Sequence, residues 1–250
     1  MVWALLPVKD LVRAKSRLSG ILAPHERRAL AQAMVEDVLS TLVAEPGLAG
    51  VLLVSDDPAA ELLANKYGVE SLSETALGCT GLNPVIEAAC ALLAGRGEPP
   101  VMVVHSDIPL LQRRDLRALL TRFRNPDRDL VLSPDLAGEG TNIMLFGSKR
   151  RPPFHYGPGS CAAHSAAARA RGMNLQILDL DNVGLDIDEP ADLLMLYQRI
   201  RAGERGEHTA ALLLDSEIGQ RLSLLRDNGL PALRETDTES GAESESGAGT

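Results

Sequence analysis

Cysteine, aromatic residues and long apolar runs are all scarce in this chain. Its three cysteines are odd in number and form no Cys-x-x-Cys pair, so we expect reduced thiols in place of a disulfide framework or a zinc site. No apolar run approaches the roughly 20 residues that span a bilayer, and the charges follow the first apolar segment, unlike the layout of a signal peptide. We therefore expect no membrane partner and a cytoplasmic location.

Basic charge is in deficit as well. The 250 residues include 25 lysines and arginines against 34 aspartates and glutamates, for a formal net charge of -9. This balance argues against a nucleic-acid partner, whose binding surface would be broadly basic. Hydrophobic residues make up 45% of the chain, enough to bury one good core. We predict a main domain over 1–203, a short helical extension over 204–234, and a disordered tail over 235–250 that contains five acidic residues and no basic one.

What the chain does contain is a regular alternation of strand-like and helical segments. Leu30, Met34, Val38 and Leu42 recur every four residues, which predicts a helix from Pro24 to about Val43. Short apolar runs predict buried strands at the start of the chain and at 51–54, 101–104, 130–132, 142–146 and 175–178. Further helices are expected after Pro58, at 83–94, after Pro109, at 161–171 and at 190–200, with short ones at 210–214 and 218–225. This alternation implies βαβ units, so we predict an α/β fold: a three-layer sandwich with a mainly parallel sheet.

A basic loop follows the first predicted strand. In open α/β sheets, ligands bind beyond the carboxyl ends of the strands, so Lys9, Arg13, Lys15 and Arg17 are expected at the binding edge, where they would cradle a polyphosphate. The alternative is a solvated basic face on an ordinary helix, because Arg13 and Arg17 are four residues apart.

Three carboxylates are candidate metal ligands. Asp107 comes just after the apolar strand at 101–104, where an unpaired carboxylate would cost several kcal/mol, so it needs a cation, N–H donors or water. Asp186 and Asp188 point to one side of an extended segment, and such a pair suits Mg²⁺. The alternative for Asp107 and Asp188 is helix capping. His105, on the strand itself, is expected to be a satisfied core histidine.

Two glycine-rich segments offer hydroxyl groups and backbone amides. These are 138–142, which ends in Thr141 and Asn142, and 156–160, which ends in Ser160 at the start of a predicted helix. Free amides at a helix N-terminus bind anions, and His164, one turn further on, could face the same site. The alternative is two tight turns with Ser160 as an N-cap. The segment 81–83 is either a base-reading loop or another N-cap.

Taken together, these segments resemble the guanylyltransferases of coenzyme F-420 biosynthesis, from residue 2 to about residue 200. The segments that carry the resemblance are Pro7-Val8-Lys9, Ala14-Lys15-Ser16-Arg17-Leu18, Gly81-Leu82-Asn83, Asp107-Ile108-Pro109, Gly140-Thr141-Asn142, Tyr156-Gly157-Pro158-Gly159-Ser160 with His164, and Leu185-Asp186-Ile187-Asp188. The resemblance implies a nucleotidyltransferase (GT-A-like, Rossmann-like) fold. It also implies the transfer of GMP from GTP to a small phosphorylated three-carbon acid, with release of diphosphate. Depending on the member, the acid is phosphoenolpyruvate, 2-phospho-L-lactate or 3-phospho-D-glycerate.

The resemblance also implies roles for individual residues. The acid would bind near Thr141, Asn142, Gly157, Ser160 and His164, and Mg²⁺ would bind Asp107, Asp186 and Asp188. GTP would contact Pro7, Lys9, Arg13, Lys15, Arg17, Gly81, Leu82 and Asn83, and the catalytic set would be Lys9, Lys15, Arg17 and Asp107. Two features depart from the pattern, namely Ile143-Met144 and the C-terminal extension, which does not align.

Other functions stay open on the sequence alone. A nucleotidyltransferase with a different acceptor, such as a molybdopterin or a sugar phosphate, would share most of these features. The absence of a GxG-rich entry loop argues against a sugar phosphate. A non-catalytic nucleotide-binding module is the alternative from another class, and three candidate carboxylates argue against it. A homodimer is the default expectation for the assembly, because such dimers are the commonest oligomers.

Overall fold

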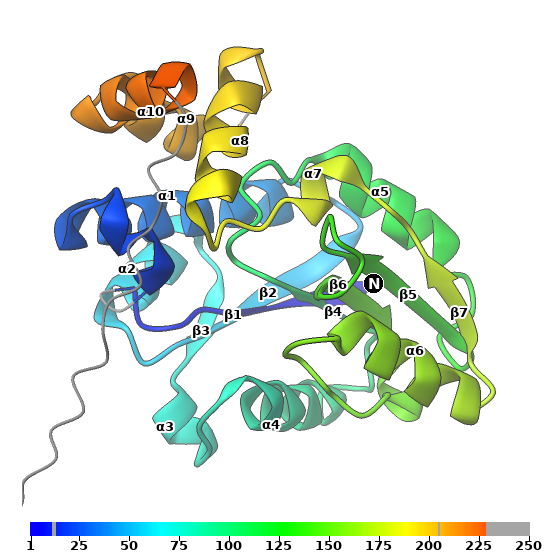
Figure 1. Ribbon diagram of the computed structural model, residues 1–250. Helices are drawn as coiled ribbons and strands as arrows, with labels where there is room; N and C mark the ends of the chain where they lie inside the picture. Colours follow the sequence, from blue (N-terminus) through cyan, green and yellow to red (C-terminus); the bar gives the residue numbers. More distant parts are fainter. Residues whose placement is uncertain (12–13, 205, 229–250) are drawn as a thin grey trace, which may run out of the picture.

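A seven-stranded sheet forms the centre of the molecule, in a computed structural model that describes residues 1–11, 14–204 and 206–228 (Figure 1). The strand order is β3-β2-β1-β4-β6-β5-β7. The strands are β1 (Val2–Pro7), β2 (Leu48–Val54), β3 (Glu70–Leu72), β4 (Val101–Val104), β5 (Asp129–Pro134), β6 (Thr141–Phe146) and β7 (Asn174–Ile177). The predicted position of Arg13 and the predicted tail at 235–250 lie outside the described residues.

β1 lies in the middle of the sheet because it is apolar on both faces. It pairs in parallel with β2 and β4, so that Leu5 lies beside Leu52 and Val103. The prediction of a mainly parallel sheet is confirmed, and the exception is β6, which runs antiparallel to both β4 and β5. Because β6 is reversed, its first residues, Thr141 and Asn142, lie at the edge where β1 and β4 end. The reversal of β6 therefore brings Thr141 and Asn142 to the same edge of the sheet as the residues that follow β1 and β4.

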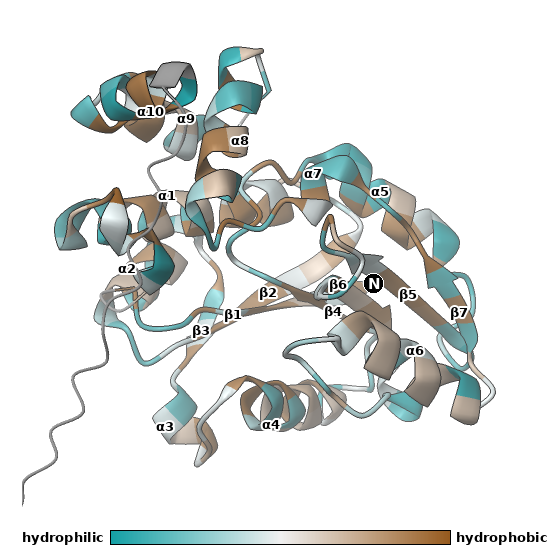
Figure 2. Cartoon of the chain, in the orientation of Figure 1, coloured by the Kyte–Doolittle hydropathy of each residue, from teal (hydrophilic) through white to brown (hydrophobic). Residues whose placement is uncertain are grey.

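Helices cover both faces of the sheet, as the three-layer prediction required. α1 (Pro24–Val43), α2 (Pro58–Tyr67) and α5 (Arg113–Arg122) pack on the face that carries Ala4 and Leu6. α4 (Leu82–Ala94) and α6 (Ser160–Ala170) pack on the face that carries Leu5 (Figure 1). Figure 2 shows the hydrophobic strands enclosed between these helices. The remaining short elements are α3 (Glu74–Leu77), α7 (Asp181–Gly184), η1 (Ser16–Gly20) and η2 (Ser148–Arg150).

The helices from Pro190 onward pack on the rest of the described chain. α8 (Pro190–Arg201), α9 (Glu207–Leu214) and α10 (Glu217–Asn228) bury a third apolar cluster with α1. The Asp37 carboxylate of α1 accepts hydrogen bonds from the backbone N–H groups of His208 (2.8 Å) and Thr209 (2.9 Å) at the start of α9. The two short helices predicted here are confirmed, and each begins earlier than predicted. Over residues 1–11, 14–204 and 206–228, no helix is both long and apolar enough to cross a membrane.

Candidate active site

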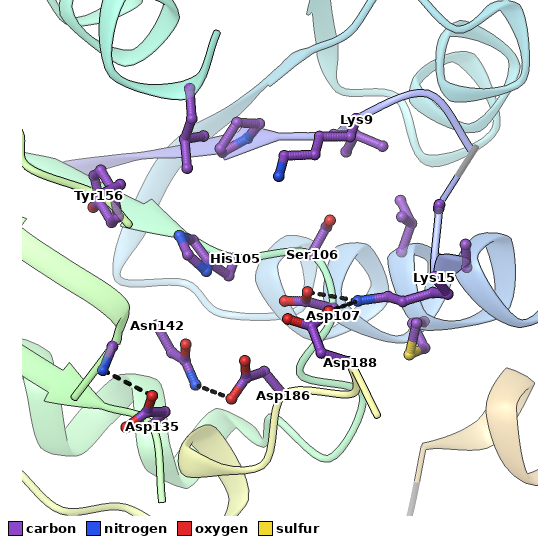
Figure 3. Close-up of a pocket in the computed structure, with 18 of the residues that line it drawn as sticks. Lys9, Lys15, His105, Ser106, Asp107, Asp135, Asn142, Tyr156, Asp186 and Asp188 are labelled. Atoms are coloured by element: carbon purple, nitrogen blue, oxygen red, sulfur yellow. Dashed lines mark hydrogen bonds and ion pairs between the residues drawn. The ribbon is translucent and has the colours of Figure 1, made fainter. Parts of the chain in front are cut away.

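A cavity of about 490 Å³ opens beyond the carboxyl ends of β1 and β4, where β6 begins (Figure 3). It gathers residues from most of the segments singled out in the sequence. The predicted site residues that line it are Pro7, Lys9, Lys15, Arg17, Leu82, Asp107, Thr141, Asn142, Gly157, Ser160, Asp186 and Asp188. Gly81, Asn83 and His164 are not among the lining residues, and Arg13 lies outside the described residues.

Lys15 forms an ion pair with two of the three candidate carboxylates. Its Nζ donates to Asp107 Oδ2 at 2.7 Å and to Asp188 Oδ1 at 3.0 Å, and its side chain is only 8% exposed (Figure 3). Burial alone would lower the pKa of Lys15, but the two carboxylates outweigh it and raise that pKa. Burial likewise would raise the pKa of Asp107, and Lys15 instead lowers it to about 2. Both groups are therefore charged at neutral pH.

The capping alternatives for the two paired aspartates are wrong. The helix after Asp107 begins only at Arg113, with Gln112 as its N-cap. The N-cap of α8 is Glu189, and the backbone N–H groups of Asp188 and Glu189 donate to Asp192. Asp107 was expected to need a cation, N–H donors or water, and the structure provides the cation, Lys15.

Among the described residues, no cation is paired with the third carboxylate, Asp186. Asn142 Nδ2 donates to its Oδ1 at 3.2 Å. Burial, followed by the negative charge of Asp107, raises the pKa of Asp186 to about 6. Placed beside a charged Asp107, this side chain would gain from a cation in the cavity.

The three carboxylates offer the oxygen ligands that a hard divalent cation prefers, but their present positions do not form a metal site. Across the described part of the chain, no group of three or more His, Cys, Asp or Glu side chains is placed to hold a metal ion. The Lys15 ammonium stands between Asp107 and Asp188 where such an ion would lie. Asp107 Oδ1 is buried and has no hydrogen-bond partner among the described residues. Within the described chain, Asp107 Oδ1 and Asp186 thus lack the positive partner that an oxygen-bound cation would provide.

The other basic residues occupy two different positions. Lys9 extends into the cavity (Figure 3). Arg17 is at the rim, with its side chain 68% exposed and its Nη1 3.4 Å from Glu189 Oε1. Lys15 adopts a left-handed backbone conformation (φ 57°) just before η1, and this turn directs its side chain away from solvent. The alternative of a uniformly solvated basic face is therefore wrong for Lys15.

Two hydroxyl groups and a histidine form a second polar cluster in the cavity wall. Thr141 Oγ1 lies 3.0 Å from His164 Nδ1 and accepts from Ser160 Oγ at 3.3 Å. His164 Nε2 accepts from the backbone N–H of His155 at 2.8 Å. Thr141, Ser160 and His164 are all buried.

The start of α6 differs from the expectation in two ways. Ser160 is the first residue of the helix, whereas the N-cap is Gly159, in a left-handed conformation (φ 71°). The expected free amides are partly used, because Ser160 N–H donates to the carbonyl oxygen of Gly157 (3.1 Å) and Cys161 N–H to that of Glu139 (2.9 Å). The side-chain hydroxyls therefore contribute more to this wall than the helix N-terminus does.

Comparison with known proteins places this chain in a family. The family model described as "Guanylyl transferase CofC like" matches residues 2–213. The chain belongs to this guanylyl transferase family. It is 39% identical to the phosphoenolpyruvate guanylyltransferase of Conexibacter woesei over 212 residues, covering 84% of this chain and 94% of that one. The identity is 32% both with the 3-phospho-D-glycerate guanylyltransferase of Phenylobacterium zucineum (86% and 96% covered) and with the 2-phospho-L-lactate guanylyltransferase of Methanocella arvoryzae (92% and 96% covered).

Solved structures support the nucleotidyltransferase fold. A putative nucleotide-diphospho-sugar transferase from Desulfovibrio desulfuricans G20 superposes with a TM-score of 0.74 at 18% identity, covering 89% of this chain and 97% of that one. A nucleotidyl transferase from Methanothermobacter thermautotrophicus gives 0.57 at 13% identity, covering 81% and 99%. The predicted fold and the predicted enzyme class, a nucleotidyltransferase, are confirmed.

Within this guanylyl transferase, the side chain of Asn83 hydrogen-bonds to the backbone of Tyr156. Its Nδ2 donates to the carbonyl oxygen of Tyr156 (3.0 Å) and its Oδ1 accepts from the N–H of Tyr156 (2.7 Å). The capping interpretation is wrong, since the N-cap of α4 is Gly81. Asn83 holds the loop that carries Tyr156 and Gly157 against the cavity, while Leu82 lines the cavity directly.

Sequence reasoning missed two residues of the site. His105 lines the cavity against the ring of Tyr156 (5.2 Å between centroids), and its Nε2 is buried without a hydrogen-bond partner in the described chain, so the expectation of a satisfied core histidine is wrong. The Asp135 carboxylate accepts the N–H groups of Glu139 (2.8 Å) and Gly140 (2.7 Å) and fixes the turn into β6. An Asp ahead of a glycine-rich turn was the signal available in the sequence.

Proposed function

We propose that this protein transfers GMP from GTP to a phosphorylated three-carbon acid, with release of diphosphate, in the biosynthesis of coenzyme F-420. The observation that carries the proposal is one cavity that combines Lys9 and Lys15, three carboxylates and a hydroxyl-lined wall. Relatives over most of the chain are named for three such acids. A purely binding module would not need all three carboxylates in the cavity.

The proposal divides the cavity into four regions. Lys9, Lys15 and Arg17, together with Arg13, bind the triphosphate. Pro7, Gly81, Leu82 and Asn83 form the guanosine side, where Asn83 acts through the loop that it holds. The hydroxyl-lined wall of Thr141, Asn142, Gly157, Ser160 and His164 binds the acid.

The fourth region is a site for Mg²⁺ on Asp107, Asp186 and Asp188. All three side chains offer hard oxygen ligands of the kind that Mg²⁺ prefers. When bound, the ion supplies neutralising charge for the transferring phosphoryl group. Lys15 must leave Asp107 and Asp188 for this site to form, and its ammonium is then free to contact the triphosphate.

The chemistry requires positioning more than proton transfer. A phosphate oxygen of the acid attacks the α-phosphorus of GTP in line, one P–O bond forms, and the bond to diphosphate breaks. The attacking phosphate is already ionised near pH 7, so no strong general base is needed. Orientation of the two substrates can contribute on the order of 7 to 11 kcal/mol, and Lys9, Lys15 and Arg17 stabilise the charge of the transferring and leaving groups.

Phosphoenolpyruvate is the first acid to test. It is the acid named for the relative at 39% identity, whereas the relatives named for the other two acids are at 32%. The three acids differ in saturation or in the position of phosphate and hydroxyl, so a small change in the cavity wall can decide among them.

The test is diphosphate release from GTP, CTP or ATP with each of the three acids in the presence of Mg²⁺. We expect release with GTP and one acid, and release slower by roughly a hundredfold or more with Asp107→Asn. A trap for unstable product, such as the next enzyme of the pathway, is included in every reaction. GTP binding without turnover, or turnover only with a sugar phosphate or a molybdopterin, would contradict the proposal.

A further inference from the structure

The hydrogen bonds around His164 have a fixed direction. The backbone N–H of His155 can only donate, so His164 Nε2, 2.8 Å away, must carry no proton. A neutral imidazole then carries its proton on Nδ1. That proton points at Thr141 Oγ1, 3.0 Å from Nδ1, and the threonine oxygen is therefore an acceptor toward the ring.

Burial keeps the imidazole neutral. His164 is 0% exposed, and burial, followed by the charges of His155 and His105, lowers its pKa to about 4. Tyr156 packs edge-on against the ring, with the centroids 4.9 Å apart, and holds its orientation. A 180° ring flip would put ring carbons in the places of Nε2 and Nδ1 and lose both hydrogen bonds, so the contacts with His155 and Thr141 fix the ring orientation.

The direction of these hydrogen bonds determines which hydroxyl proton faces the cavity. Thr141 and Ser160 carry two hydroxyl protons, and the 3.3 Å contact between their oxygens uses one. Because the ring donates to Thr141, it takes up neither of them. Among the described residues one O–H is then left without an acceptor, and both Thr141 and Ser160 line the cavity. With the opposite tautomer, Thr141 would donate to the ring, Ser160 to Thr141, and no O–H would face the cavity.

We propose that His164 is a positioning residue that fixes the Thr141 and Ser160 hydroxyls so that one O–H donor faces the cavity, selecting an ionised carboxylate on the acceptor substrate. A carboxylate is an acceptor-only group and satisfies this donor, whereas a hydroxymethyl group in its place forms a weaker, uncharged hydrogen bond. The inference rests on the proposed function for the identity of the substrate. The tautomer itself does not depend on it.

The first test observes the tautomer directly and requires no turnover. Long-range proton–nitrogen NMR correlations distinguish a protonated Nδ1 from a protonated Nε2, and the chain has only five histidines, so the His164 signal can be assigned by its loss in His164→Asn. We expect the Nδ1–H form between pH 6 and 8. Observation of the Nε2–H form would overturn the inference whatever the enzyme's substrate proves to be.

The second test separates positioning from a general loss of structure. In His164→Leu, the KM for the acid should rise about ten- to a hundredfold, as for a lost hydrogen bond to a charged group, while the KM for GTP changes little. His164→Asn should recover much of the loss, because its Nδ2 can donate from near the position of Nδ1. His155→Ala is the matched control: it removes the neighbouring ring but keeps the backbone N–H, and we expect it to behave as wild type.

The contact with Thr141 supplies the decisive comparison. In a Thr141→Val background, adding His164→Leu should raise the KM for the acid little further, because both changes remove the same donor. Glycerol 3-phosphate carries a hydroxymethyl group in place of the carboxylate of 3-phospho-D-glycerate. It should compete poorly with the acid for the site of the wild-type enzyme, and comparatively better for the site of His164→Leu. Additive effects of the two substitutions, or equal rises in KM for acid and GTP, would overturn the inference. Absence of product with any acid in wild type would instead count against the proposed function.

Discussion

Replacing Lys15 by methionine should make the protein bind a divalent metal ion more tightly. The Lys15 ammonium donates hydrogen bonds of 2.7 Å to Asp107 and 3.0 Å to Asp188, and a metal ion must displace both. A hydrogen bond to a charged group contributes about 1.5 to 3 kcal/mol. Because the Asp188 side chain is 51% exposed, we discount the pair to about 2 kcal/mol in total, roughly a 30-fold change in affinity.

The assay is calorimetric titration of nucleotide-free protein with Mg²⁺ or Mn²⁺. Lys15→Met should gain metal affinity and lose GTP affinity, because the same ammonium is expected to contact the triphosphate. Lys9→Met is the matched control: it removes the same charge from the same cavity but leaves the two hydrogen bonds of Lys15 in place. Metal affinity in Lys15→Met that is unchanged, or raised no more than in Lys9→Met, would refute the reasoning.

Three further perturbations test separate parts of the structure. Asp107→Asn should lower turnover by roughly a hundredfold or more while the protein stays folded by circular dichroism, and near-normal activity would remove Asp107 from the catalytic set. The pKa of His164 is about 4 in the folded protein and near 6.5 in the unfolded chain, so the unfolded state binds more protons between these pH values. The free energy of unfolding should therefore fall by up to about 3 kcal/mol as the pH drops from 6.5 to 4. Urea denaturation at pH 4.5 and 7 should show a smaller pH effect in His164→Asn, and an unchanged pH effect would contradict this assignment. Asp37→Ala removes the acceptor for the N–H groups of His208 and Thr209 and should destabilise the protein by about 1 to 2 kcal/mol in urea denaturation, whereas an unchanged midpoint would mean that the start of α9 contributes little.

The longer helices and strands were predictable because their apolar residues recur over enough positions to show a period. α1 extends from Pro24 to Val43 as the four-residue repeat indicates. β3, α3 and α7 were missed, since segments of three or four residues show no period. The reversal of β6 was also out of reach. Its apolar residues look like those of a parallel strand, and its direction depends on the turn fixed by Asp135.

The site shows a similar division. The motifs identified which segments meet, because polar groups that follow buried strands gather at one edge of the sheet. The motifs did not identify which side chains pair with each other. Lys15 is 92 residues from Asp107 and 173 residues from Asp188, and no local pattern connects residues so far apart. Asn83 is similar: its sequence fits a cap or a base-reading loop, and its contact with Tyr156 depends on how α4 and the following loops pack.

The most direct test of the central claim is isotope tracing of the transferred group. Phosphoenolpyruvate labelled with ¹⁸O in its phosphate is incubated with GTP, Mg²⁺ and the enzyme, and the products are analysed by mass spectrometry. If a phosphate oxygen of the acid attacks the α-phosphorus of GTP, the label stays in a product that joins GMP to the acid, and the released diphosphate carries none. The same experiment is run with labelled 2-phospho-L-lactate and 3-phospho-D-glycerate. Label in the diphosphate, or no GMP-linked product with any of the three acids, would contradict the account.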